Sequence, residues 1–135
     1  MPQFRFSEAA RLMGVSDDTV RRWVDTNQLS SGKDAVGRKV VDGAELAQFA
    51  KTQARQVTDP TNVVRSARNK FVGLVTEVIM DGVMAQVELQ CGAHRLVSLM
   101  SAEAARELGL APGVLAVAVV KSTQVMVEVP ELEST

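Results

Sequence analysis

The residues best suited to binding chemistry form two short polar segments in the second half of the chain. The first is Ser66-Ala67-Arg68-Asn69, and the second is Lys121-Ser122-Thr123, which lies between two valine-rich runs. Together the segments offer hydroxyl groups, backbone N–H groups and two cations, and neither contains a carboxylate or a histidine. A small tetrahedral dianion needs such a site, because its oxygens only accept hydrogen bonds and are attracted by positive charge. Two structural interpretations are also open at this point: Lys121 as a solvated lysine at a strand end, and Arg68 as a brace that donates to carbonyl groups.

The composition is that of a folded protein of modest size. The 135 residues suffice for one domain or two small ones, and 46% hydrophobic and 23% charged residues are ordinary values. The single cysteine, Cys91, excludes an intrachain disulfide and a cysteine zinc site, which is typical of a reducing compartment. No apolar run is long enough for a signal peptide or a membrane span, so we expect a cytoplasmic protein without a membrane partner.

The first half of the chain predicts two helices joined by a short turn. Ser7 is expected to cap the first helix, Gly14 to end it, and Ser16 to cap a second helix that continues to Thr26. The buried side of the second helix is expected to consist of Val15, Val20, Trp23 and Val24. Two helices with such a turn form a helix-turn-helix, whose second helix presents a recognition surface for DNA. That surface is expected to consist of Ser16, Asp18, Thr19, Arg21 and Arg22.

A glycine-containing segment with basic residues follows the helix-turn-helix. Ser30 to Val41 contains Gly37 and is expected to form a hairpin, or wing, whose cations are Lys33, Arg38 and Lys39. Asp42 or Gly43 would then start a third helix. Residues 1–58 contain more Lys and Arg than Asp and Glu, whereas the rest of the chain contains fewer Lys and Arg than Asp and Glu. The net positive charge of the first half is typical of a DNA-binding domain.

Four short segments of the first half form a familiar pattern. They are Ser7-Glu8-Ala9-Ala10, Gly14-Val15-Ser16, Thr19-Val20-Arg21-Arg22-Trp23 and Asn27-Gln28-Leu29. With this pattern, residues 4–55 resemble the winged helix-turn-helix of the MerR and excisionase families. The resemblance implies a domain over residues 1–57 that binds double-stranded DNA. The alternative is a small helical module that binds protein.

The hydrophobic pattern changes its period after a polar linker at residues 58–62. Five strands are expected, at residues 69–80, 83–89, 94–99, 114–120 and 125–129, with a short helix at 101–108 between the third and the fourth. This order suggests a small OB-like β-barrel over residues 63–130, followed by a flexible acidic tail at 131–135. The predicted fold class is therefore α+β, a winged helix-turn-helix followed by a five-stranded barrel with one short helix.

Five pieces of the second half occur together in a characteristic order. They are Ser66-Ala67-Arg68-Asn69, Phe71-Val72-Gly73, Ser101, Leu108-Gly109-Leu110 with Pro112-Gly113, and Lys121-Ser122-Thr123. Residues 63–129 thereby resemble the TOBE/Mop family of molybdate-binding domains. The resemblance implies that molybdate or tungstate binds between the subunits of a homo-oligomer. The corresponding residues of this chain are Ser66, Arg68, Ser101, Lys121 and Ser122, and the further candidates are Ala67, Asn69 and Thr123. Ala104 departs from the pattern, because some relatives have a further hydroxyl there.

No residue pattern predicts catalysis. The sequence has no nucleophile with a partnering base, no phosphate-binding loop and no metal motif, and His94 has no Cys or acidic residue at ligand spacing. We therefore expect a molybdate- or tungstate-responsive DNA-binding transcriptional regulator, with no enzymatic activity, no metal site and no organic cofactor. Two alternatives remain: an intracellular oxyanion-storage protein, and a regulator whose second domain serves only oligomerisation.

Overall fold

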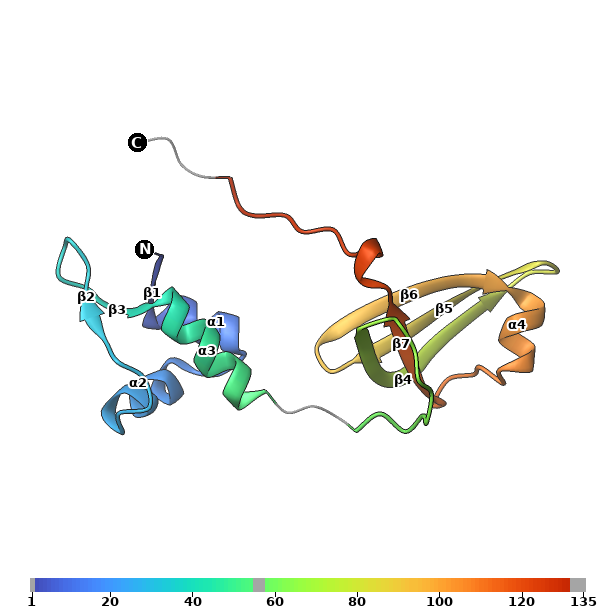
Figure 1. The fold of residues 1–135 in the computed structure, drawn as a ribbon, viewed down its shortest axis with the longest axis horizontal. Coiled ribbons are helices and arrows are strands. Elements are labelled where there is room, and N and C mark those ends of the chain that lie inside the picture. The colour runs from blue at the N-terminus through green and yellow to red at the C-terminus, as the bar shows by residue number, and fades with distance from the viewer. Residues whose placement is uncertain (1, 55–57, 132–135) are drawn as a thin grey trace. The chain divides into compact units, whose positions relative to one another are not determined.

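The chain divides into two compact units, Met1–Gln56 and Val57–Thr135, in a computed structural model that describes residues 2–54 and 58–131 (Figure 1). The end of the predicted first domain at 55–57 lies outside the described residues. The same holds for all but the first residue of the predicted tail at 131–135. None of the helices in the described ranges is both long and apolar enough to cross a membrane.

The first unit packs three helices against a small sheet. Its elements are β1 (Gln3–Arg5), α1 (Phe6–Met13), α2 (Asp17–Asp25), β2 (Gly32–Lys33), β3 (Lys39–Asp42) and α3 (Gly43–Gln53), with the sheet order β1-β3-β2. The buried core residues are Ala9, Ala10, Val20, Leu29, Val41 and Leu46. Trp23 packs edge-to-face on Phe49 with 4.8 Å between the ring centroids, which ties α2 to α3. The predicted helix-turn-helix and wing are therefore confirmed.

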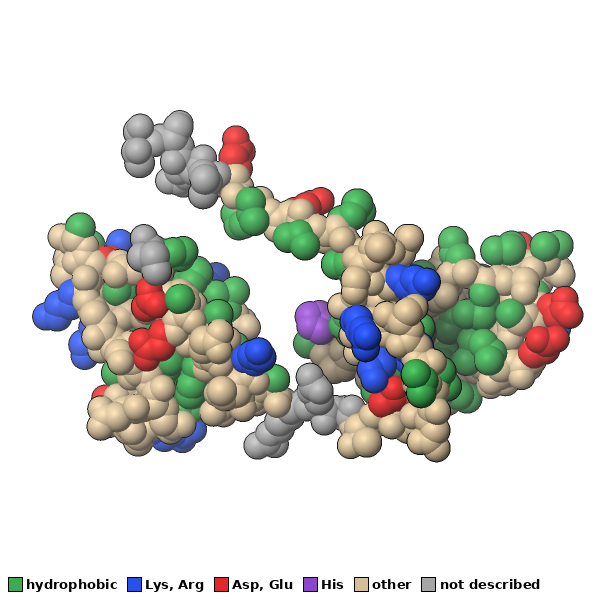
Figure 2. Space-filling view, in the orientation of Figure 1, with side chains coloured by type: hydrophobic (Ala, Val, Ile, Leu, Met, Phe, Trp, Pro, Cys, Tyr) green, Lys and Arg blue, Asp and Glu red, His purple; other side chains and the backbone are tan. Residues whose placement is uncertain are grey.

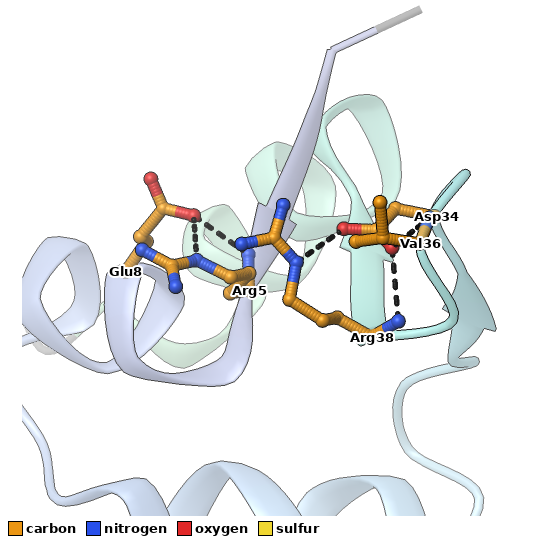
Figure 3. A network of polar contacts seen from close by, with 5 residues as sticks. All are labelled: Arg5, Glu8, Asp34, Val36 and Arg38. Carbon is orange, nitrogen blue, oxygen red and sulfur yellow. Dashed lines mark hydrogen bonds and ion pairs between the residues drawn. The ribbon is translucent and has the colours of Figure 1, made fainter.

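The starts of the first two helices differ in how they are capped. The prediction of Ser7 as the first cap is wrong, because α1 begins at Phe6 and Arg5 is its N-cap, with the Glu8 carboxylate accepting from the Arg5 N–H at 3.0 Å (Figure 3). Ser16 does cap α2, and its hydroxyl accepts from the Thr19 N–H at 3.2 Å. Gly14 ends α1 at φ 69°, a left-handed conformation that glycine adopts without a steric cost.

The second unit is a curled antiparallel sheet with one short helix, so the predicted α+β class is confirmed. The elements are β4 (Asn69–Met80), β5 (Met84–Cys91), β6 (His94–Ser101), α4 (Ala102–Glu107), β7 (Leu115–Val120) and the 3-10 turn η1 (Ser122–Gln124), with the sheet order β6-β5-β4-β7. The buried core residues are Val75, Val87, Leu89 and Cys91. In the described part of the chain β6 and β7 are the edges of this sheet, which leaves the barrel open between them.

The fifth predicted strand differs from the prediction. Residues 125–129 form no strand in the structure and extend away from the sheet, with Met126 89% and Val127 85% exposed (Figure 1). The alternation of valines there is that of a strand, but a strand also needs a neighbouring edge for its hydrogen bonds. Within the described residues of one chain, no edge takes up this segment.

The curl of the sheet has a local cause at Gly73 and a nearby bulge. A Cβ at Gly73 would lie 2.4 Å from the carbonyl oxygen of Gln90 and 2.6 Å from Sγ of Cys91, so only glycine allows β5 to approach β4 this closely. The β4–β5 register shifts between Val75 and Glu77, and bulges of this kind increase the local twist of a strand.

We predict that Gly73→Ala destabilises the second unit by about 1–3 kcal/mol, because the added methyl group collides with backbone. Denaturant unfolding followed by far-UV circular dichroism would measure this loss. The only tryptophan, Trp23, belongs to the first unit, so its fluorescence transition should not move. Gly82→Ala is the matched control, since a Cβ there meets nothing within 4 Å. Equal stability of the two variants would contradict the prediction.

Candidate functional site

The β4–β7 pairing brings the two polar segments together. Asn69 lies opposite Val120 in the antiparallel register, and the Asn69 side-chain amide donates to the Val120 carbonyl at 3.1 Å. Ser66–Asn69 enters β4 at the place where Lys121–Thr123 leaves β7, so the segments meet at one end of the sheet (Figure 1). Figure 2 shows Lys and Arg side chains gathered on this part of the second unit.

Apart from Asn69, the polar residues of the two segments are exposed to solvent. Ala67 is buried, whereas Ser66 and Arg68 on either side of it are exposed. On the other segment Lys121 precedes the turn η1, and its carbonyl accepts from the Gln124 N–H at 2.8 Å. Neither Arg68 nor Lys121 forms an ion pair within the part of the chain that the structure describes. Both cations are therefore available to an anion from solution.

Ser101 lies at the other end of the sheet. It pairs with Met84 at the start of β5, level with the end of β4, and its hydroxyl caps α4 by accepting from the Ala104 N–H at 3.0 Å. Asn69 begins β4 and Met80 ends it, so about 35 Å of strand separates Ser101 from the other predicted anion-binding residues. A single copy of the chain does not bring all of these residues into one pocket.

Three charged residues beside the first segment were absent from the sequence prediction. The Asp59 carboxylate accepts from the N–H and the hydroxyl of Thr61 at 2.8 and 2.6 Å. It also forms ion pairs with Arg65 at 3.6 Å and Lys70 at 3.4 Å. The Asp59-Pro60-Thr61 sequence is a signal for such a turn, since Asp often accepts from the N–H two residues later. The long-range pair with Lys70 has no comparable sequence signal.

The predicted DNA-contacting residues lie on α2 and on the wing. Arg21 and Arg22 are exposed on α2, and Arg21 has only a 3.8 Å contact with exposed Asp18. The hydroxyls of Ser16 and Thr19 bond to each other at 3.0 Å, so they belong to the start of the helix. Figure 2 shows basic side chains projecting from both α2 and the wing.

The wing holds one of its three cations in a fixed position. Lys33 and Lys39 face each other across β2 and β3, and both are exposed. Arg38 instead donates from Nε to Asp34 at 2.8 Å, and the same carboxylate accepts from the Arg38 and Val36 N–H groups (Figure 3). Hydrogen bonding from the Arg38 backbone is the main cause that lowers the pKa of Asp34. These bonds fix the turn, and the Arg38 side chain remains 56% exposed.

The remaining candidate groups show no reactive chemistry. Burial raises the pKa of the Cys91 thiol, which keeps it protonated and unreactive. No group of His, Cys, Asp and Glu side chains in residues 2–54 and 58–131 is arranged to hold a metal ion.

Comparison with known families identifies both units. Residues 4–54 match the model of a helix-turn-helix domain, and residues 65–127 match that of the TOBE domain. The molybdenum-pterin-binding protein 2 of Clostridium pasteurianum is 40% identical over 63 residues, which are 46% of this chain and 93% of that protein.

Solved structures align with about half of this chain. The cytoplasmic molybdate-binding protein ModG, in a form with molybdate bound, aligns over 54% of this chain and 52% of its own with 38% identity and a TM-score of 0.50. This chain thus spans about half of ModG. A molybdate-binding protein from Sporomusa ovata aligns over 49% of this chain and 98% of its own, with 30% identity and a TM-score of 0.47.

The fold and the matches define a two-unit protein in which a helix-turn-helix domain precedes a TOBE domain. Through the second unit, the chain belongs to the TOBE family.

The charge cluster around Asp59 predicts a pH dependence. Hydrogen bonds from Thr61, aided by Lys70 and Arg65, lower the pKa of Asp59 from 3.8 to about 2. A carboxyl with a lowered pKa stabilises the folded state fully above pH 3.8, and this contribution is lost as the pH falls through about 2. An NMR titration of the side-chain carboxyl should show the low midpoint. The Thr61→Val substitution should raise it toward 3.8, and an unchanged midpoint in this variant would contradict the assigned cause.

Proposed function

We propose that the protein is a DNA-binding transcriptional regulator that senses molybdate or tungstate. The principal support is the β4–β7 register, which sets Ser66 and Arg68 in the segment that enters β4 beside the segment Lys121–Thr123 that leaves β7. The match of this unit to the TOBE domain, with relatives whose names refer to molybdate or molybdenum, makes a tetrahedral oxyanion the natural ligand. The regulator is a binding protein of the cytoplasm, with no catalytic step and no organic cofactor.

The oxyanion site is completed between copies of the chain. Ser101 belongs to the predicted site but lies at the far end of the sheet from Asn69, so a second copy must supply one of the two parts. Charge-assisted hydrogen bonds from several directions would then surround the dianion. The rigid ends of β4 and β7 set the size of the pocket, which distinguishes the dianion from sulfate.

The residues after β7 provide the means of assembly. A cavity of about 490 Å³ opens between β6 and β7, lined by apolar residues that include Leu96, Leu110 and Val117. Residues 125–129 are exposed and alternate as a strand does, and Figure 2 shows the hydrophobic side chains along this segment. The open edge and the unpaired segment are complementary, so we propose that the segment of one copy completes the sheet of another.

The first unit reads DNA. Arg21, Arg22, Lys33, Arg38 and Lys39 supply phosphate contacts and contacts to guanine edges from α2 and the wing. One helix-turn-helix covers a half-site, so an assembled dimer binds two half-sites at a spacing set by its symmetry.

Oxyanion storage is the second candidate function. It is favoured by one observation: the second unit alone accounts for 93% of the Clostridium pasteurianum relative, so a complete protein of that kind needs no helix-turn-helix. Under this hypothesis the first unit serves assembly and does not bind DNA.

We predict that two sets of substitutions separate DNA binding from oxyanion binding. Arg21→Ala with Arg22→Ala should weaken binding to promoter fragments in fluorescence anisotropy and reduce the salt slope by about one for each lost phosphate contact. Molybdate titration of this variant should be unchanged. Lys121→Ala should weaken molybdate binding by about 10- to 100-fold in calorimetry, because a charge-assisted hydrogen bond is lost.

The controls for this experiment are Lys51→Ala and sulfate. Lys51 lies in the last turn of α3, outside α2 and the wing, so its loss should leave DNA affinity unchanged. Sulfate should give no heat. DNA binding absent from the unsubstituted protein would leave storage as the function, and an unchanged molybdate affinity in Lys121→Ala would refute the proposed site.

We predict further that Val127→Asp abolishes assembly, because a carboxylate would have to enter the apolar gap between β6 and β7. Light scattering coupled to size-exclusion chromatography should show a shift to monomers. Glu128→Gln is the neighbouring control, whose side chain points to the opposite face of the proposed strand and should leave the oligomer intact. A monomer in the unsubstituted protein would contradict this mode of assembly.

A further inference from the structure

Asp59 connects the predicted linker to the anion segment. Its carboxylate, Thr61 and Arg65 form a closed ring of contacts, in which the Thr61 hydroxyl donates to Asp59 and accepts from Arg65 at 2.6 Å. The ion pair with Lys70 joins this ring to the second residue of β4. The side chains of Asp59 and Arg65 are only 20% and 17% exposed. The cluster is therefore packed into the folded unit.

The two cations of this cluster enclose the anion segment in the sequence. Arg65 immediately precedes Ser66, and Lys70 immediately follows Asn69. Together with Arg68 and Lys121, they make four cations at the end of the sheet where the segments meet. Figure 2 shows an acidic side chain at the margin of the basic patch in this region. Two of the four cations thus already have an anionic partner, which is Asp59.

The contacts of Asp59 differ in how easily they can be exchanged. The bonds from Thr61 are short, whereas the ion pairs to Arg65 and Lys70 at 3.6 and 3.4 Å exceed the usual 2.7–2.9 Å of a charge-assisted hydrogen bond. Long pairs on flexible side chains are held mainly by charge and have little fixed geometry. A dianion nearby attracts the same cations more strongly than a single carboxylate does.

We propose that Asp59 is an internal competitor of the oxyanion, which lowers the affinity of the site by holding Arg65 and Lys70. This inference rests on the proposed oxyanion site. Binding of the dianion draws the two cations away from Asp59 and leaves the turn at Asp59–Thr61 with its hydrogen bonds to Thr61 alone. That turn lies in the segment that connects the helix-turn-helix to the TOBE unit. Occupancy of the oxyanion site therefore removes the two ion pairs that hold this connecting segment to Arg65 and Lys70.

The test is a calorimetric titration with molybdate of the full chain and of two matched variants. Asp59→Asn keeps an acceptor for Thr61 and removes the charge, and we expect about three- to tenfold tighter binding, as for the loss of two weak ion pairs. Asp81→Asn removes the same charge from a similar turn, in which Asp81 accepts from the Val83 N–H at 2.8 Å and has no cationic partner in the described residues. It should leave the affinity unchanged.

A third variant assigns the effect to the two cations. In Arg65→Gln with Lys70→Gln, the additional Asp59→Asn substitution should no longer tighten binding, because no cation is left to release. A readout on the unsubstituted protein does not depend on any variant folding. Amide hydrogen exchange at Thr61 should become faster when molybdate saturates the site.

Several results would overturn the inference. These are equal or weaker binding in Asp59→Asn, equal tightening in Asp81→Asn, and unchanged or slower exchange at Thr61. If the unsubstituted protein binds molybdate and any of these results is found, the inference fails while the proposed function stands. If neither the unsubstituted protein nor Asp59→Asn binds molybdate, both fail.

Discussion

The antiparallel register between β4 and β7 is the constraint on which the candidate site depends. It sets Asn69 opposite Val120, and the Asn69 amide locks that position by donating to the Val120 carbonyl. A shift by one residue would exchange the faces of every side chain on the strand and separate the hydroxyls of one segment from the cation of the other. Gly73 protects this register, because it lets β4 contact β5 on one side while it pairs with Ala116 of β7 on the other.

Local signals in the sequence predicted most elements of the second unit. The alternation from Asn69 to Met80 and the Asp81-Gly82 turn predicted β4 with its observed bounds, and Ser101 was expected at the start of the short helix that it caps. In the first unit, Ser16 and Asp42 marked helix starts in the same way. These signals succeed because a cap or a turn is decided by residues within three or four positions of each other.

Features that depend on distant partners could not be predicted in this way. β1 has only three residues and is a strand because it pairs with β3, and the Asp59–Lys70 ion pair requires the fold to bring the two residues together. The alternating valines at 125, 127 and 129 predicted a strand that the structure does not contain, because pairing requires an edge that the described part of one chain does not provide. The candidate site is divided for a related reason. Short sequence segments showed which residues could bind an anion, whereas the position of Ser101 at the far end of β4 follows from the topology alone.

The proposed division of the site between copies would have a thermodynamic consequence for the proposed regulator. A ligand shifts an equilibrium only to the extent that it binds one state more tightly than the other. An oxyanion that contacts residues from two copies has its full affinity only for the assembled state, so it stabilises assembly by mass action. Assembly would also determine how many helix-turn-helix domains contact DNA together. Two tethered DNA-binding domains bind far more tightly than one. In the proposed regulator, coupling between oxyanion and DNA would need no direct contact between the two units, because both ligands would favour the same oligomer.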